Sequence, residues 1–140
     1  MILLADIGAT NARFSVTTDC HQYEHSDNLQ VVGFDSLEEL CNDYLNRYQL
    51  ANKVNKAVIG VAAPIINDEV SFVNANISFS IQGLKKQLFK EGLIVINDLA
   101  LQAHAIKGLE KNEFSFIGLN KQQVNGPKLL VSPGTGLGLA

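Results

Sequence analysis

A polar turn near the start of the chain has the composition of a phosphate-binding loop. It runs from Asp6 to Asn11 between two apolar segments, which together predict a β-hairpin. Gly8 lets backbone N–H groups approach a ligand closely, and Thr10 and Asn11 add side-chain donors. Asp6 places one carboxylate just before the turn, where it could hold a hydrated Mg²⁺ through water. This combination suits a Mg²⁺-bound polyphosphate, although the same residue types are common in ordinary hairpin turns.

A second candidate site is the pair Asn97 and Asp98, which ends an apolar segment and precedes a helical one. Ligands of open α/β sheets bind at the carboxyl ends of the strands. A carboxylate at that position can accept the proton of an attacking hydroxyl, one of the few chemical roles left to the protein in phosphoryl transfer. Aspartate is also among the best helix N-caps. Asp98 is therefore predicted to be a general base or a cap, and the two roles do not exclude each other.

The end of the chain contains a second glycine-rich segment, Gly134 to Gly138. The apolar segment before it predicts a strand, so the two together fit a hairpin whose N–H groups bind phosphate. Three glycines also occur in flexible tails, so this segment alone does not specify a phosphate site.

These three segments, in this order, resemble the motifs of the bacterial glucokinases, a family of the actin-like sugar-kinase superfamily. Residues 6–13 resemble the first phosphate motif, with Ala9 where the family usually has a second glycine. Residues 96–98 resemble its sugar-site Asn-Asp, and residues 134–138 its second phosphate motif. Asn74 and the segment 79–81 resemble the loop over the sugar, with Ile77 in place of a tryptophan.

The resemblance implies ATP-dependent phosphorylation of glucose to glucose 6-phosphate, a step of glycolysis, with ATP and Mg²⁺ as cofactors. Asp98 would be the catalytic base, and Asn97, Asp98 and Asn74 would bind glucose or a similar hexose. Asp6 would also hold the metal through water. The implied nucleotide contacts are Asp6, Gly8, Ala9, Thr10, Asn11, Arg13, Gly134, Thr135, Gly136, Leu137 and Gly138. The alternatives are a kinase for another hexose and a catalytically silent sugar-binding or sensor module.

The fold that this resemblance implies is α/β, an actin-like ATPase or ribonuclease H-like half with a five-stranded mixed sheet flanked by helices. The predicted domains are residues 1–119, the N-terminal domain, and residues 120–140, a linker with the first strand and phosphate turn of a truncated second domain. The family's remaining sugar ligands would lie beyond Ala140. This chain is therefore expected to be an N-terminal portion, inactive alone, of a cytoplasmic homodimer. Its last strand is expected to lack a sheet partner.

The elements that must position these residues follow from the apolar spacing. Strands are predicted over residues 2–8, 11–18, 29–34, 56–62, 93–98, 113–119 and 128–132. The first three form an antiparallel meander, and the fourth runs parallel to the first. Ser36 and Glu39 form a capping box for a helix over 37–48, whose apolar stripe should pack on the sheet. Further predictions are a small hairpin around residues 67–68, a loop over 74–80, and helices over 81–89, capped by Ser80, and 99–107.

The bulk composition is that of a globular domain, with 140 residues, 46% of them hydrophobic and 18% charged. A net charge of −3 gives no support for binding nucleic acid or an anionic membrane surface. Cys20 and Cys41 lack metal-ligand spacing and are expected to be free thiols in a reducing cytoplasm. No segment approaches the ~20 apolar residues of a membrane helix.

Overall fold

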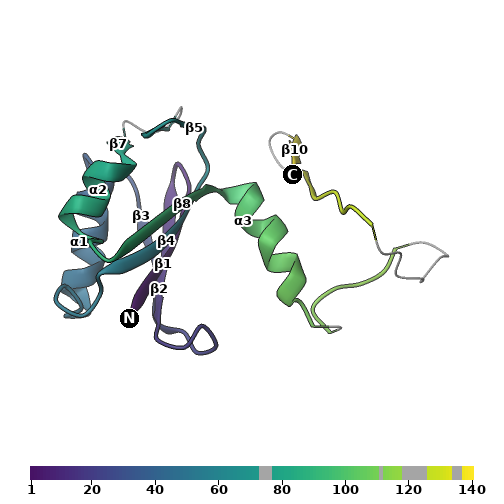
Figure 1. Ribbon diagram of the computed structural model, residues 1–140, viewed down its shortest axis with the longest axis horizontal. Coiled ribbons are helices and arrows are strands. Elements are labelled where there is room, and N and C mark those ends of the chain that lie inside the picture. Colours follow the sequence, from purple (N-terminus) through teal and green to yellow (C-terminus); the bar gives the residue numbers. More distant parts are fainter. Residues whose placement is uncertain (73–76, 111, 118–125, 134–136) are drawn as a thin grey trace. The chain divides into compact units, whose positions relative to one another are not determined.

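The computed structural model describes residues 1–72, 77–110, 112–117, 126–133 and 137–140 (Figure 1). These residues divide into two compact units, Met1–Asp98 and Leu99–Ala140. The first unit is built on a five-stranded mixed sheet with the strand order β3-β2-β1-β4-β8, which confirms the predicted sheet. The domain division at residues 119 and 120 remains a prediction.

An antiparallel meander of β1 (Ile2–Ile7), β2 (Asn11–Thr17) and β3 (Glu24–Gln30) forms one side of this sheet. The third strand was predicted with its main part over residues 29–34; the strand is present, but these bounds are wrong, because it ends at Gln30 and Val31 to Phe34 form a turn. Most of β3 is polar and exposed, since it lies at the edge of the sheet. A bulge opposite Ser15, where His25 has a φ of 54°, also breaks its alternation.

The other side of the sheet is parallel, as predicted for residues 56–62 and 93–98. β4 (Lys56–Val61) runs parallel to β1, and β8 (Gly92–Asn97) runs parallel to β4. The register places Ile7 opposite Val61 and Val61 opposite Asn97. The carboxyl ends of all three strands therefore lie in one row at one edge of the sheet.

Two helices, α1 (Leu37–Arg47) and α2 (Ile81–Gln87), lie on the same side of the sheet in Figure 1. α1 starts where its capping box predicts, with the Ser36 hydroxyl accepting from the Glu39 N–H at 3.1 Å. The Glu39 carboxylate in turn accepts from the backbone N–H of Asp35. The helix contributes its predicted apolar stripe to the core. The buried side chains of that stripe are Leu37, Leu40, Cys41, Tyr44 and Leu45.

A small antiparallel sheet follows β4. Its strands are β5 (Ile65–Ile66), β6 (Glu69–Ser71) and β7 (Ser78–Ser80). β5 and β6 form the hairpin predicted around residues 67–68, where Asn67 takes a φ of 56°. The sequence predicted a loop over residues 74–80, and this is wrong for residues 78–80, which form β7 and pair with β6. A strand this short leaves little alternation to detect in the sequence.

α3 spans Asp98–Ala105, and all of it after Asp98 belongs to the second unit. This unit also contains the turn η1 (Ile106–Gly108) and a hairpin of β9 (Val131–Pro133) and β10 (Leu137–Leu139). The hairpin extends to a pair of backbone hydrogen bonds between Leu130 and Ala140. The expectation that this strand lacks a partner is therefore wrong. Residues 113–117, within the strand predicted over 113–119, are not a strand in the structure. None of the helices described here is long and apolar enough to cross a membrane.

Candidate functional site

The turn between β1 and β2 is closed by its own backbone. The N–H of Gly8 donates to the carbonyl of Asn11 at 2.9 Å. A Cβ built on Gly8 would lie only 3.2 Å from that carbonyl oxygen, so a side chain here would crowd the turn. Neither Gly8 nor Ala9 has a positive φ. Alanine at position 9 is therefore free of backbone strain, although the family motif usually has glycine there.

The same turn is held on both sides and presents donors at its tip. The carbonyl of Ile7 accepts from the N–H of Ala62 at 3.0 Å, and the carbonyl of Thr10 accepts from the N–H of Val31 at 2.9 Å. The N–H groups of Ala9 and Thr10 donate to no other described residue. A fixed turn with two available backbone donors and the exposed side chain of Thr10 has the chemistry to bind an anion.

Asp6 and Arg13 face each other across β1 and β2 in register. An Arg13 guanidinium nitrogen donates to Asp6 Oδ2 at 2.9 Å, with 67% of the Arg13 side chain and 46% of the Asp6 side chain exposed. An ion pair this exposed contributes at most ~1 kcal/mol to stability. Its effect is geometric, because it fixes one carboxylate oxygen and leaves the other without a partner among the described residues.

Gln30 is a residue of this site that sequence analysis missed. Its amide nitrogen donates to Asn11 Oδ1 at 2.8 Å, which directs the amide nitrogen of Asn11 away from β3. The two residues are direct cross-strand partners. The pairing could have been found from the sequence only with the correct bounds for β3.

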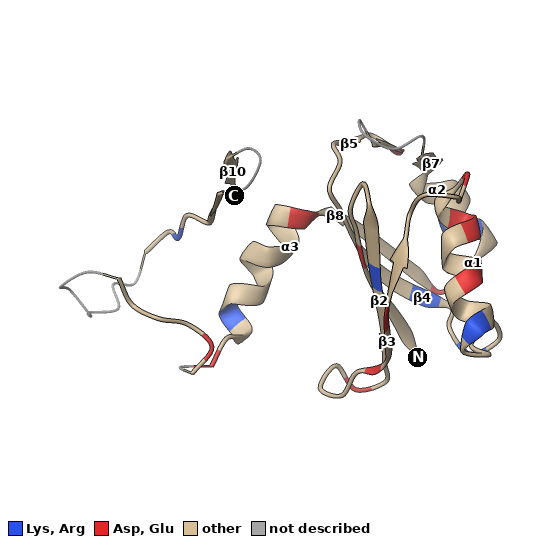
Figure 2. Cartoon of the chain, turned by 180° about the vertical axis from the view of Figure 1, so that it is seen from behind, with Lys and Arg blue, Asp and Glu red and all other residues tan. Residues whose placement is uncertain are grey.

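Asn97 and Asp98 lie at the same edge of the sheet as the turn. Asn97 ends β8, separated from Ile7 at the end of β1 only by Val61 of β4. Strands are spaced about 4.8 Å apart, so the ends of β1 and β8 are about 10 Å apart. Asp98 is the first residue of α3 and the acidic residue of its first turn, and the start of α3 is red, the colour of Asp and Glu, in Figure 2. Helix N-termini favour a carboxylate at this position.

The loop predicted to cover the sugar is only partly described, since Asn74 lies outside the described residues. Ile77, which the resemblance places where a tryptophan is expected, is buried in the core with an exposed fraction of 3%. The Ser80 hydroxyl caps α2 as predicted, accepting from the N–H of Gly83 at 2.9 Å. It also donates to a carboxylate oxygen of Asp68, which sequence analysis did not single out.

The second glycine-rich segment forms the expected hairpin. Leu137 and Gly138 belong to β10, and Gly138 pairs with Ser132. Gly134, Thr135 and Gly136 lie outside the described residues. A Cβ on Gly138 would overlap the side chain of Leu99, so any larger residue at this position would require that side chain or its surroundings to move.

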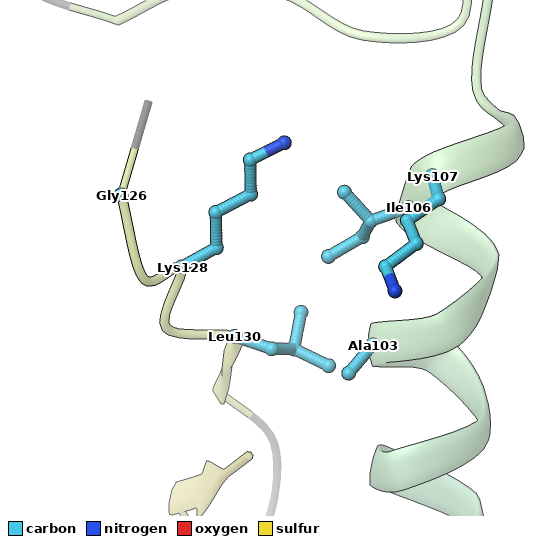
Figure 3. A pocket seen from close by; sticks show the side chains of 6 residues that line it. All are labelled: Ala103, Ile106, Lys107, Gly126, Lys128 and Leu130. Carbon is cyan, nitrogen blue, oxygen red and sulfur yellow. The ribbon is translucent and has the colours of Figure 1, made fainter. Parts of the chain in front are cut away.

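A cavity of about 310 Å³ in the second unit contains none of the predicted site residues (Figure 3). Its lining combines apolar side chains with those of two lysines. The lining residues are Ala103, Ile106, Lys107, Gly126, Lys128 and Leu130. Among the described residues, no group of three or more His, Cys, Asp or Glu side chains could hold a metal ion.

Comparison with known proteins identifies relatives of the whole chain. Residues 3–140 match the family model for glucokinase. Glucokinases of Helicobacter acinonychis (strain Sheeba) and Helicobacter pylori (strain P12) are each 38% identical over 140 residues, 99% of this chain and 42% of the relative. A Campylobacter jejuni subsp. doylei glucokinase is 33% identical over 138 residues, covering 99% of this chain and 41% of the relative. The chain thus spans less than half the length of these relatives.

Solved structures agree with this assignment. A glucokinase from an Antarctic psychrotroph superposes with a TM-score of 0.85 at 32% identity, covering 99% of this chain and 44% of the other. A putative sugar kinase from Cytophaga hutchinsonii superposes with a TM-score of 0.64 at 19% identity, covering 99% of this chain and 46% of the other, and shows the fold alone. The predicted actin-like fold is confirmed.

Proposed function

The chain belongs to the glucokinase family, and we propose that the protein of which it is part transfers a phosphoryl group from ATP to the 6-hydroxyl of glucose. The observation that carries this proposal is the register of the parallel strands. It brings the donor-rich turn after Ile7 and the Asn97-Asp98 pair to one edge of the sheet, separated by a single strand. A phosphate-binding turn and a carboxylate at one edge are the parts that phosphoryl transfer requires.

On the sugar side, Asp98 acts as the general base. It takes the proton of the 6-hydroxyl while that oxygen forms its bond to the γ-phosphorus and the bond from phosphorus to the ADP oxygen breaks. Asn97 and Asn74 hold neighbouring hydroxyls and so fix the direction of attack. General-base catalysis of this kind contributes about 10²–10⁴-fold.

On the phosphate side, the backbone N–H groups of Ala9 and Thr10, with the side chains of Thr10 and Asn11, bind phosphate oxygens. Gln30 supports this arrangement because it holds the Asn11 amide in one orientation. Arg13 contributes positive charge beside the turn. Residues 134–138 supply the second half of the phosphate site, with Leu137 and Gly138 at its end.

The residues present fit Mg²⁺ bound through water. Asp6 has one carboxylate oxygen fixed by Arg13, and its other oxygen has no partner among the described residues. A single carboxylate is the usual protein contribution to a Mg²⁺ ion that keeps most of its waters and binds substrate phosphates. When bound, Mg²⁺ would neutralise the charge that develops on the phosphate oxygens. Asp6 would orient one of its waters.

We propose further that the protein acts in glycolysis and in the cytoplasm, and that the full-length protein is a homodimer. The test is a full-length chain that contains these 140 residues, assayed for ADP release with glucose, mannose, fructose and N-acetylglucosamine. We expect turnover with glucose and formation of glucose 6-phosphate. Turnover only with another hexose would show that the protein is a kinase for that sugar. Sugar binding without turnover would favour the sensor module.

A further inference from the structure

Leu99 and Gly138 fit together in the second unit without room for a side chain at position 138. Leu99 is the second residue of α3, and Gly138 is the middle residue of β10. A Cβ on Gly138 would overlap Leu99 Cδ1 and would lie 3.2 Å from Cδ2 and 3.3 Å from Cγ. Rotation about the Cβ–Cγ bond of Leu99 moves the two methyl carbons but leaves Cγ in place. A methyl group at position 138 therefore requires either that Leu99 change its rotamer about the Cα–Cβ bond, which moves Cγ, or that the helix or the hairpin shift.

This crowding is specific to Gly138 among the described glycines of its unit. A Cβ on Gly108 or on Gly126 would meet no atom within 4 Å. Gly138 also lacks a positive φ, so backbone conformation is not what requires glycine there. The crowding comes from the leucine packed against it.

The two partners belong to segments with different predicted roles. Gly138 pairs with Ser132 in the hairpin that carries the second phosphate motif. Leu99 directly follows Asp98, the predicted general base, in the first turn of α3. We propose that Leu99 is a positioning residue: its side chain, seated against Gly138, fixes the second glycine-rich hairpin relative to the first turn of α3. This inference rests on the proposed kinase function.

The size of the effect follows from how phosphoryl transfer is catalysed. The protein contributes mainly by positioning, and a misplacement of about 1 Å can cost about 10²-fold in rate. Adding one methyl group at Gly138 should displace the hairpin by a distance of this order. Removing the outer atoms of Leu99 should reopen the space and allow the hairpin to return.

The kinetic test uses four variants of the full-length chain. Gly138→Ala should lower kcat by about 10- to 100-fold with little change in the KM for glucose, since the sugar-binding residues are not displaced. Leu99→Ala in the Gly138→Ala background should recover part of this loss, which is the sign of direct coupling. Leu99→Met, which keeps an apolar side chain of similar volume, should stay close to wild type. Gly108→Ala adds the same methyl group in open space and should leave kcat unchanged.

A structural readout on the 140-residue chain accompanies the kinetics. A nuclear Overhauser effect should join the Leu99 methyl groups to the Gly138 α-protons, and its absence would overturn the proposal. An active wild type whose Gly138→Ala variant matches Gly108→Ala would overturn this proposal alone. A wild type that phosphorylates no hexose would overturn the proposed function and this inference with it.

Discussion

Each of the two hairpins that carry the predicted phosphate motifs contains a crowded glycine, but the crowding has a different origin in each. At Gly8 the obstacle is the carbonyl oxygen of Asn11, a backbone atom of the same turn. At Gly138 the obstacle is the side chain of Leu99, distant in the sequence. Neither glycine has a positive φ. A side chain at Gly8 would therefore be crowded by the backbone of its own turn, and one at Gly138 by a leucine packed against it.

The two hairpins also differ in how many neighbouring strands support them. The first belongs to a five-stranded sheet, in which β1 and β2 each pair with a strand on both sides. The second is a two-stranded sheet among the described residues. A two-stranded hairpin alone is marginally stable in water. The first turn should therefore be rigid without help from the rest of the chain, whereas the second depends on what packs against it.

The largest difference between the two hairpins should be in their amide hydrogen-exchange rates, measured on the 140-residue chain. Amides of β1 should exchange only through global unfolding, which costs about 5–15 kcal/mol in a domain of this size. The amides of Leu130 and Ala140, paired with each other, should exchange at least about 10³-fold faster after correction for intrinsic rates. Equal protection of the two hairpins would contradict the comparison.

Gly8→Val should affect nucleotide binding more than folding. Its β-branched side chain would press on the Asn11 carbonyl and block the approach of phosphate to the turn. We expect Mg-ADP affinity, measured by calorimetry on the full-length chain, to fall by about tenfold, or about 1.4 kcal/mol.

The matched control for this prediction is Gly92→Val in β8, where a Cβ would lie 3.8 Å from Lys56 Cγ in ordinary contact. Thermal melts of both variants distinguish loss of fold from loss of binding. Unchanged nucleotide affinity in Gly8→Val would show that the first turn is structural only.

Ala9→Gly should have the smallest effect, although it restores the usual family residue. Because Ala9 has no positive φ, glycine relieves no strain there. It adds freedom to the unfolded chain and should lower the free energy of unfolding by about 0.4–1 kcal/mol. Nucleotide affinity should change less than it does in Gly8→Val. A stabilised variant in urea denaturation would show that the alanine is strained after all.

Much of the fold could be predicted because its apolar patterns are strong. The buried strands β4 and β8 and the capping box at Ser36 all appear where the sequence places them. The errors fall where tertiary context outweighs local pattern. Polar residues form β3 because the sheet edge tolerates them, and β7 is too short to give a signal.

The candidate site was predicted as separate motifs, and only the structure shows how some of them combine. The register of β1, β4 and β8 brings the first turn and Asn97 to one edge, which spacing along the chain does not specify. Gln30 and Leu99 were missed because their roles come from partners that only the folded chain reveals. Neither residue type has a characteristic chemistry that would have singled it out.

The central claim is that Asp98 is the base of a glucose kinase, and one variant of the full-length chain tests it directly. Asp98→Asn keeps the size of the side chain but removes the carboxylate that accepts the proton. We expect kcat to fall by about 10²–10⁴-fold while glucose binding, measured by calorimetry, is retained. The control, Asp35→Asn, removes an equal charge from an exposed position before α1 and should leave kcat unchanged. An Asp98→Asn enzyme that turns over within a few-fold of wild type would contradict the account and leave Asp98 with only a structural role.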